Sequence, residues 1–208
     1  MTEQNTVHRY VPISEIDDLR DAAHASNKQL GRQLRDEAIL VLLADLGLRV
    51  NELVQLKRSM FRLEQGELML PADIQKDYPT EQSPKSATMR LDPYGHFNTV
   101  RLLRSYFSSS WYQSQESDYV FPSRQSEQMT TESVRNVVER LAVEGDVQPR
   151  RTDGEPADAS EIHPHALRHS VANYMLADED TRLVDVRNRL RHRSISTTER
   201  VYEHFQRR

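Results

Sequence analysis

Apolar positions recur at helical spacing in the first quarter of the chain. One helical face carries Leu34, Ala38, Ile39, Leu42, Leu43 and Leu46. The next residue, Gly47, readily adopts the positive φ that ends a helix, so we expect a core helix that stops there. Ser14, with an acidic residue three positions on, has the spacing of a capping box and predicts another helix to about Ala25. Residues 50–56 predict a short helix, which puts Arg49 in the turn between two helices.

Between Ser59 and Asp92 the pattern changes to the alternation typical of β-strands. Three short segments carry it: MFRL at 60–63, ELMLP at 67–71 and ATMRL at 87–91. A turn at 64–66 separates the first two, so a small antiparallel sheet of three strands is predicted. The loop at 72–86 is long for a hairpin and mostly polar, which is typical of a segment that closes on a ligand.

Helical periodicity returns beyond Pro93. It predicts helices over residues 94–107, 131–144, 164–177, 182–190 and 196–205. Segment 146–161 is polar and contains Pro and Gly, so we expect an exposed loop. The fold class expected is mostly α with a small three-stranded antiparallel β-sheet, an α+β fold, in a single domain over residues 1–208.

Composition and charge narrow the function classes. The chain of 208 residues contains no cysteine, which excludes a disulfide framework, a thiolate metal site and a cysteine nucleophile. No apolar run is long enough to span a bilayer and no signal peptide opens the chain, so we expect a cytoplasmic protein. The net charge is −4, yet residues 181–208 carry eight arginines against three acidic residues. This end is either a phosphate-facing surface or a solvated helix face.

Four segments concentrate reactive side chains. These side chains are Arg49, Lys76 and Lys85, His165 and Arg168, and His192 and Tyr202. Each is ordinary by itself, but together they are the groups needed to break a phosphodiester without a metal. Guanidinium groups can clamp the nonbridging oxygens as negative charge builds on phosphorus. A phenol with a pKa near 10 needs a proton acceptor and cationic surroundings to attack, and a lysine on a β-loop can protonate the departing sugar oxygen.

These segments resemble the catalytic part of the phage-integrase type of tyrosine recombinase. LGLRVNELVQL is similar to the family's first arginine motif, HALRH to its His-x-x-Arg motif, and LRHRSISTTERVYEH to the block that ends in Tyr-x-His. YVFPS, ahead of the helix at 131–144, is a softer match, and order and spacing agree from about Tyr10 to His204. The resemblance implies the family's catalytic fold and a site-specific recombinase or integrase that breaks and rejoins DNA.

The resemblance also implies a role for each matching residue. Arg49 and Arg168 would bind the scissile phosphate, His192 would hydrogen-bond it, and His165 would act in proton transfer. Tyr202 would form a 3′-phosphotyrosyl bond to DNA. The implied partner is duplex DNA, bound by a homotetramer on synapsed duplexes although the isolated chain is expected to be a monomer. Neither a metal nor a cofactor is implied.

The family's acidic support position and its catalytic lysine also have counterparts. Glu52 fits the acidic position. The lysine lies on the hairpin between the second and third strands, where Lys76 fits better than Lys85, although both are on the loop.

The chain departs from the family pattern in three places. Arg191 stands where the family usually has glycine, directly before His192. The N-terminal core-binding domain that clamps the other side of the DNA is expected to be absent, since the similarity begins within about ten residues of Met1. Only six residues follow Tyr202, which leaves little for a tail helix.

Three other readings remain open at the level of sequence. His163, His165 and His169, with Glu161 nearby, could form a metal site. The chain could also be a noncatalytic DNA-binding or regulatory derivative of a recombinase, which the acidic net charge favours. A type IB topoisomerase would share the chemistry, but the His-x-x-Arg and Leu-x-His blocks favour the recombinase.

Overall fold

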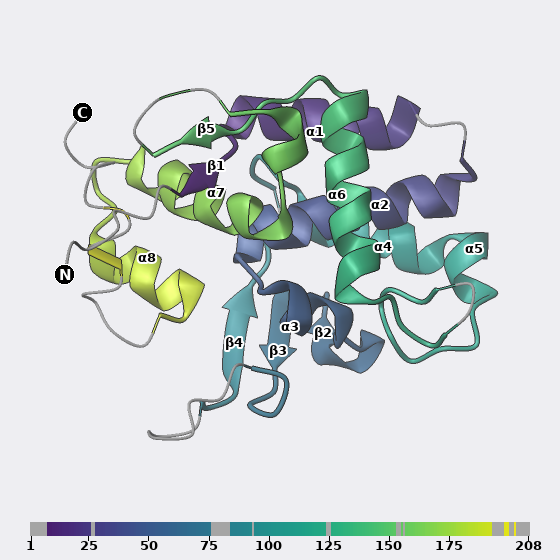
Figure 1. The fold of residues 1–208 in the computed structure, drawn as a ribbon. Coiled ribbons are helices and arrows are strands. Elements are labelled where there is room, and N and C mark those ends of the chain that lie inside the picture. The colour runs from purple at the N-terminus through teal and green to yellow at the C-terminus, as the bar shows by residue number, and fades with distance from the viewer. Residues whose placement is uncertain are drawn as a thin grey trace.

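Helices make up most of the fold, and a small sheet lies at one side of them (Figure 1). The computed structural model describes residues 8–25, 28–75, 84–92, 94–123, 126–152, 155, 157–192, 198–199 and 202. The helices are α1 Ile13–Ala25, α2 Leu30–Leu46, α3 Val50–Val54, α4 Thr99–Ser108, α5 Ser110–Gln113, α6 Thr131–Glu144, α7 Pro164–Leu176 and α8 Leu183–Leu190. The strands are β1 Arg9–Tyr10, β2 Phe61–Arg62, β3 Glu67–Leu70, β4 Ala87–Arg90 and β5 Arg150–Arg151, and short 3₁₀ turns occupy Arg58–Met60 and Ala159–Glu161. The expected fold class is confirmed.

Helix α2 is the centre of the core. It is buried almost throughout, and α1, α4, α5, α6 and α7 all pack against it. A helix that is apolar on most sides is stable only when it is surrounded in this way. Its buried carboxylates are paired: Asp36 with Lys28, Arg35 and Arg140, and Glu37 with Arg20 and His24. The core helix predicted from the apolar spacing is confirmed, and it starts four residues earlier than its first predicted position.

The three-stranded antiparallel sheet is also confirmed, in the order β2-β3-β4. Leu68 on β3 lies opposite Phe61 on β2 and Met89 on β4, and all three side chains are buried. Gly66 takes a φ of +64° in the tight turn between β2 and β3. The alternation of apolar and polar residues therefore places one face of the sheet on the core. Strand β4 lies close to the end of α8 (Figure 1).

Two helix starts differ from the prediction. Ser14 lies inside the first turn of α1 and does not cap it, because the carbonyl of Pro12 accepts the N–H groups of Glu15 and Ile16. Helix α4 begins at Thr99 and not near residue 94. The carboxylate of Asp92 accepts the N–H groups of Tyr94, Gly95, Phe97 and Asn98, so this stretch folds around a side chain instead of forming a helical turn.

Segment 146–161 contains structure where only an exposed loop was predicted. Its strand β5 pairs antiparallel with β1, with Arg9 opposite Arg151 and Tyr10 opposite Arg150. Two-residue strands carry too little alternation to be recognised in a sequence. Beyond β1, the N–H of Val11 donates to Ser170 Oγ at 2.8 Å, which fixes the N-terminal segment on α7.

The C-terminal part forms a second, smaller apolar cluster between α7 and α8. Its buried members are Val171, Ala172, Val186, Leu190 and Tyr202. The helix predicted over residues 196–205 is described only at Thr198, Glu199 and Tyr202, which are helical, and its remaining residues lie outside the described part of the chain. None of the helices in the described ranges is both long and apolar enough to cross a membrane.

Gly47 joins the two clusters. It caps α2 in the left-handed region with a φ of +57°, and a Cβ placed on it would overlap Leu190 Cδ2 on α8. Its carbonyl also accepts a hydrogen bond from Arg168 Nη1. Only glycine meets both requirements, a positive φ and contact of the backbone with a neighbouring helix.

We expect Gly47→Ala to lower the free energy of unfolding by about 2–4 kcal/mol, because left-handed strain of about 1–2 kcal/mol adds to overpacking against Leu190. Gly66→Ala is the matched control: its φ is also positive, but the nearest atom to the new Cβ is Val100 Cγ2 at 3.9 Å. It should cost only about 1 kcal/mol. Urea unfolding of both variants measures the difference. Equal losses would show that contact with α8 contributes nothing.

Candidate active site

Arg49 is held at the start of α3 by a carboxylate three residues on. It occupies the N-cap position, where its N–H donates to Glu52 Oε2 at 2.8 Å and its Nη1 donates to Glu52 Oε1 at 2.9 Å. The Glu52 side chain is 1% exposed, whereas that of Arg49 is 24% exposed. The carboxylate is therefore enclosed and the guanidinium is accessible. This contact occurs because the two residues are three apart at a helix start, where the side chain at the third position folds back on the cap.

Arg168 is fully buried on α7. Its guanidinium donates to two backbone carbonyls, that of Gly47 at the end of α2 and that of Leu190 at the end of α8. Burial, and after it the positive charges of Arg49 and Arg191, lower the pKa of Arg168 to about 9. Helix C-termini carry partial negative charge, so the two carbonyls partly compensate this cation. A bound anion would complete the compensation.

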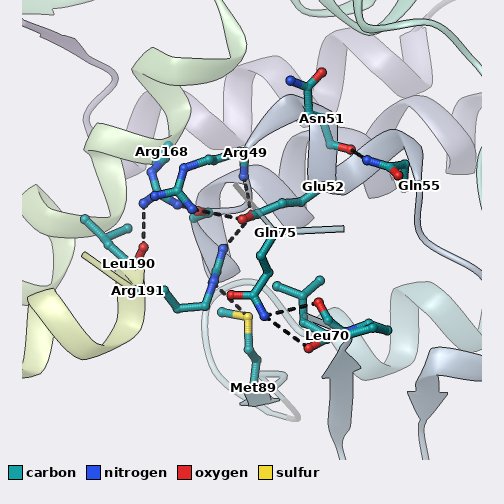
Figure 2. A network of polar contacts seen from close by, with 12 residues as sticks. Arg49, Asn51, Glu52, Gln55, Leu70, Gln75, Met89, Arg168, Leu190 and Arg191 are labelled. Carbon is teal, nitrogen blue, oxygen red and sulfur yellow. Dashed lines mark hydrogen bonds and ion pairs between the residues drawn. The ribbon is translucent and has the colours of Figure 1, made fainter. Parts of the chain in front are cut away.

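Arg191 closes α8 in an uncommon conformation. It is the C-cap residue with a φ of +54°, in the left-handed region that glycine adopts without strain. A bulky residue there costs roughly 1–3 kcal/mol. Its Nη2 nevertheless donates to Glu52 Oε2 at 2.6 Å, on the carboxylate that also holds Arg49 (Figure 2). We call Arg49, Arg168, Arg191 and Glu52 the arginine cluster.

The arginine cluster holds more positive than negative charge. Its three guanidinium groups accompany one carboxylate, which pairs with Arg49 and Arg191, and this gives a net charge of +2 in a chain whose total is −4. Figure 2 shows the guanidinium groups of Arg49 and Arg168 close together. Two such groups side by side are suited to the oxygens of a phosphate, which can accept hydrogen bonds from both.

The histidines of α7 begin beside this cluster. His163 caps the helix, with its Nδ1 accepting the N–H of Ala166 at 3.2 Å, and Pro164 occupies the first turn as predicted. His165 is exposed at its outer edge, yet loss of water around the rest of its ring, and after it the positive charge of Arg168, lower its pKa to about 4. The ring is therefore neutral at pH 7 and can accept a proton.

His192 lies beside Tyr202 after the end of α8. Its Nδ1 lies 3.0 Å from the buried Thr198 Oγ1, and its ring is nearly parallel to that of Tyr202, at 3° with 6.0 Å between centroids. Burial lowers the pKa of His192 to about 3, with Arg168 contributing next. The sequence block around His192 and Tyr202 thus brings these residues together as expected.

Tyr202 is completely buried and in contact with His169. The phenol oxygen lies 2.6 Å from His169 Nδ1, and burial raises the pKa of Tyr202 while Arg168 opposes that rise. Burial also lowers the pKa of His169 to about 2, so the ring stays neutral and its Nδ1 can accept a hydrogen bond from the phenol. The sequence suggests His169 only as a metal ligand. Its position four residues after His165, on the same face of α7, is the feature that could have indicated a place in this site.

The two candidate lysines differ in what can be said of them. Lys76 lies outside the described residues. Lys85 is exposed just ahead of β4, and its carbonyl accepts a hydrogen bond from Gln75 Nε2 at 2.9 Å. The same amide lies 3.3 Å from the Leu70 carbonyl oxygen and 3.2 Å from that of Pro71, at the end of β3. Gln75 therefore joins the two sides of the loop directly before Lys76, on the side of the molecule where Met89 and Arg191 lie (Figure 2).

The alternative metal site is not assembled in the part of the chain that the structure describes. No three or more His, Asp or Glu side chains converge there in a way that could hold a metal ion. His163 and His165 stack with 6.4 Å between ring centroids, and His169 turns to Tyr202.

The arginine cluster, the buried phenol of Tyr202 and several neutral histidines together form a site that is suited to an anion and that contains a tyrosine. The sequence profile of the phage integrase family matches residues 10–208. The chain therefore belongs to the phage integrase family. The tyrosine recombinase XerD of Haemophilus influenzae is 30% identical over 199 residues, 94% of this chain and 58% of that protein. XerD of Vibrio cholerae is 31% identical over 184 residues, 86% of this chain and 52% of that protein. The chain thus spans between half and three fifths of their length.

Solved structures share the fold. The XerA recombinase superposes with a TM-score of 0.71 at 22% identity, over 98% of this chain and 62% of that one. The XerH site-specific recombinase, bound to its palindromic difH substrate after cleavage, superposes with a TM-score of 0.73 at 20% identity, over 100% of this chain and 52% of that one. The architecture is that of tyrosine recombinases.

The depressed histidine pKa values predict that stability falls in mild acid. Each ring takes up a proton near pH 6.5 when unfolded but only at much lower pH when folded, so stability is present above about pH 6.5 and is lost as pH falls toward 4. His169→Gln removes one such proton and should lessen the slope of unfolding free energy against pH by about 1 kcal/mol per unit between pH 6 and 5. Urea unfolding across this range measures it. An unchanged slope would contradict the burial of a neutral His169.

Proposed function

We propose that this chain is the catalytic domain of a site-specific recombinase that cleaves and rejoins duplex DNA through a covalent 3′-phosphotyrosyl intermediate. The observation that carries the proposal is the placement of Tyr202 beside His169 and His192, next to the arginine cluster. The positive charge of that cluster is larger than the negative charge of its one carboxylate. Membership of the family and the similarity to XerD recombinases support it.

The residues present would supply each part of a transesterification. Tyr202 Oη would attack the scissile phosphorus, forming the tyrosyl–phosphate bond while the bond to the 5′ oxygen of the next nucleotide breaks. Arg49 and Arg168 would bind the nonbridging oxygens, and His192 would hydrogen-bond the phosphate. The phenol proton would pass to His165, which is neutral at pH 7.

The leaving 5′ oxygen needs a proton, which we assign to Lys76. It follows Gln75, which is fixed between the two sides of the hairpin loop. The reverse attack by a free 5′ hydroxyl on the phosphotyrosyl bond rejoins the strand, and the phosphoester energy is conserved without a high-energy cofactor. No metal takes part in this scheme.

Tyr202 must leave its pocket before it can react. Its side chain is completely buried and its oxygen contacts His169, so no phosphate in solution can reach it in this conformation. Binding of a phosphate between Arg49 and Arg168 would supply free energy to move Tyr202 away from His169. We therefore propose that this conformation is a resting arrangement, in which the phenol of Tyr202 is protonated and covered.

The proposed partner is duplex DNA. The neighbours in structure include XerH bound to difH substrate before and after cleavage, and an integrase of the transposon Tn1549 in complex with circular intermediate DNA. Exchange of strands requires two duplexes, so we propose a homotetramer on synapsed DNA and a monomer without it. We also propose that the reaction takes place in the cytoplasm, as the sequence leads us to expect.

A nicked-duplex assay tests the nucleophile. The substrate is a pool of labelled duplexes, randomised around a nick placed so that the short cleaved fragment diffuses away and rejoining is blocked. Wild-type protein should form a covalent adduct on a denaturing gel, and Tyr202→Phe should form none while binding the pool with unchanged affinity, because it lacks only the attacking oxygen. Tyr94→Phe, on a fully exposed phenol, is the control that keeps the adduct. Adduct formation by Tyr202→Phe at the wild-type level would refute the assignment.

A bridging sulfur substitution tests the general acid. Lys76→Ala should slow cleavage by about 10²–10⁴-fold, and Lys85→Ala should change it little. Replacing the bridging 5′ oxygen with sulfur should restore the Lys76→Ala rate, because a thiolate leaves without a proton. Equal defects in both variants, or no recovery with sulfur, would rule out Lys76 as the acid.

A further inference from the structure

Arg191 adopts a backbone conformation that its side chain disfavours. Three described residues other than glycine have a positive φ: Asn98, Asp146 and Arg191. Asn and Asp enter this region readily, whereas a long side chain such as Arg does so at a cost. Strain that persists at one position is a reason to ask what the side chain does there.

The Arg191 guanidinium lies inside the protein, where its two terminal nitrogens have partners and its Nε has none among the described residues. Its side chain is only 11% exposed, and its Nη2 donates to Glu52 Oε2 at 2.6 Å. On the other side, its Nη1 contacts Met89 Sδ at 2.9 Å, on strand β4 (Figure 2). Arg191 therefore joins the end of α8 to α3 and to the sheet, and it points into the fold and away from solvent.

Glu52 is shared between two arginines as a result. Its Oε1 accepts from Arg49 Nη1 at 2.9 Å, and its Oε2 accepts from the Arg49 N–H and from Arg191. A carboxylate paired with Arg49 alone would neutralise that guanidinium. With Arg191 on its second oxygen, the carboxylate is fixed in orientation, and Arg49 keeps positive charge for a phosphate.

We propose that Arg191 is a positioning residue for the cleavage reaction, acting through Glu52 on Arg49. The proposal rests on the function proposed above. The turn that Arg191 occupies leads directly into His192, whose N–H donates to the Arg187 carbonyl at 2.9 Å. One ion pair thus fixes the turn before His192 relative to Arg49. A glycine at this position would relax the backbone and lose that connection.

Substitution of Arg191 in the nicked-duplex assay tests the proposal. Arg191→Asn removes the guanidinium and keeps a residue that accepts a positive φ, and Arg191→Gly removes the strain as well. Both should attach to DNA roughly 10- to 100-fold more slowly in single turnover, because a displaced Arg49 no longer fits the transition state. Affinity for the same duplex, measured in the Tyr202→Phe background, should stay within about threefold. The control is Arg104→Asn, which breaks the exposed ion pair between Arg104 on α4 and Glu64, and it should react at the wild-type rate.

A double-mutant cycle shows whether Arg191 acts through Arg49. In the Arg49→Ala background, adding Arg191→Asn should slow attachment by less than about twofold, since the group that it positions is already gone. Wild-type rates in both Arg191 variants would overturn the proposal. Independent losses that multiply in the double variant would overturn it too, since Arg191 would then act without Arg49.

Failure of the proposed function can be told apart from failure of this inference. If wild-type protein forms no adduct, the function fails, and the position of Arg49 is then read by ¹⁵N NMR of its Nε–Hε group, identified by its loss in Arg49→Lys. Loss or broadening of that signal in Arg191→Asn supports positioning. An unchanged Arg49 signal overturns it.

Discussion

Two guanidinium groups pair with one buried carboxylate near the ends of α3 and α8, with the buried Arg168 of α7 beside them, and the remaining positive charge constrains the rest of the structure. Arg168 can be buried there because the C-terminal carbonyls of two helices accept its hydrogen bonds. That arrangement requires Gly47 to end α2 in the left-handed region and in contact with Leu190. At the left-handed C-cap of α8, the side chain of Arg191 then reaches Glu52. The helix ends are thus arranged around a net positive charge that a bound phosphate would neutralise.

Burial of this site also determines the state of its titratable groups. Exclusion of water lowers the pKa values of His165, His169 and His192 and raises that of Tyr202. Neutral rings beside a protonated phenol are stable together in a cationic region, since none of them adds positive charge. The same environment favours the phenolate once a phosphate has brought Tyr202 toward the guanidinium groups, because an anion is then forming where cations are already fixed.

Much of this arrangement could be predicted from the sequence. The apolar spacing in α2 and the alternation in β2, β3 and β4 are long or regular enough to determine the elements, and the residue order in the three motifs brings Arg168, His192 and Tyr202 to one place. The short β1–β5 pair and the turn around Asp92 could not be predicted, because each depends on contacts that no local pattern records. The pairing of Tyr202 with His169 and the use of Arg191 inside the fold depend on how α7 and α8 pack.

Mass spectrometry of the adduct identifies the residue that forms the bond to DNA. After nuclease digestion of the adduct and cleavage with trypsin, we expect the peptide of residues 201–207 to carry a nucleotide through a 3′ phosphate on Tyr202. A nucleotide on any other residue, or linkage through a 5′ phosphate, would contradict this expectation.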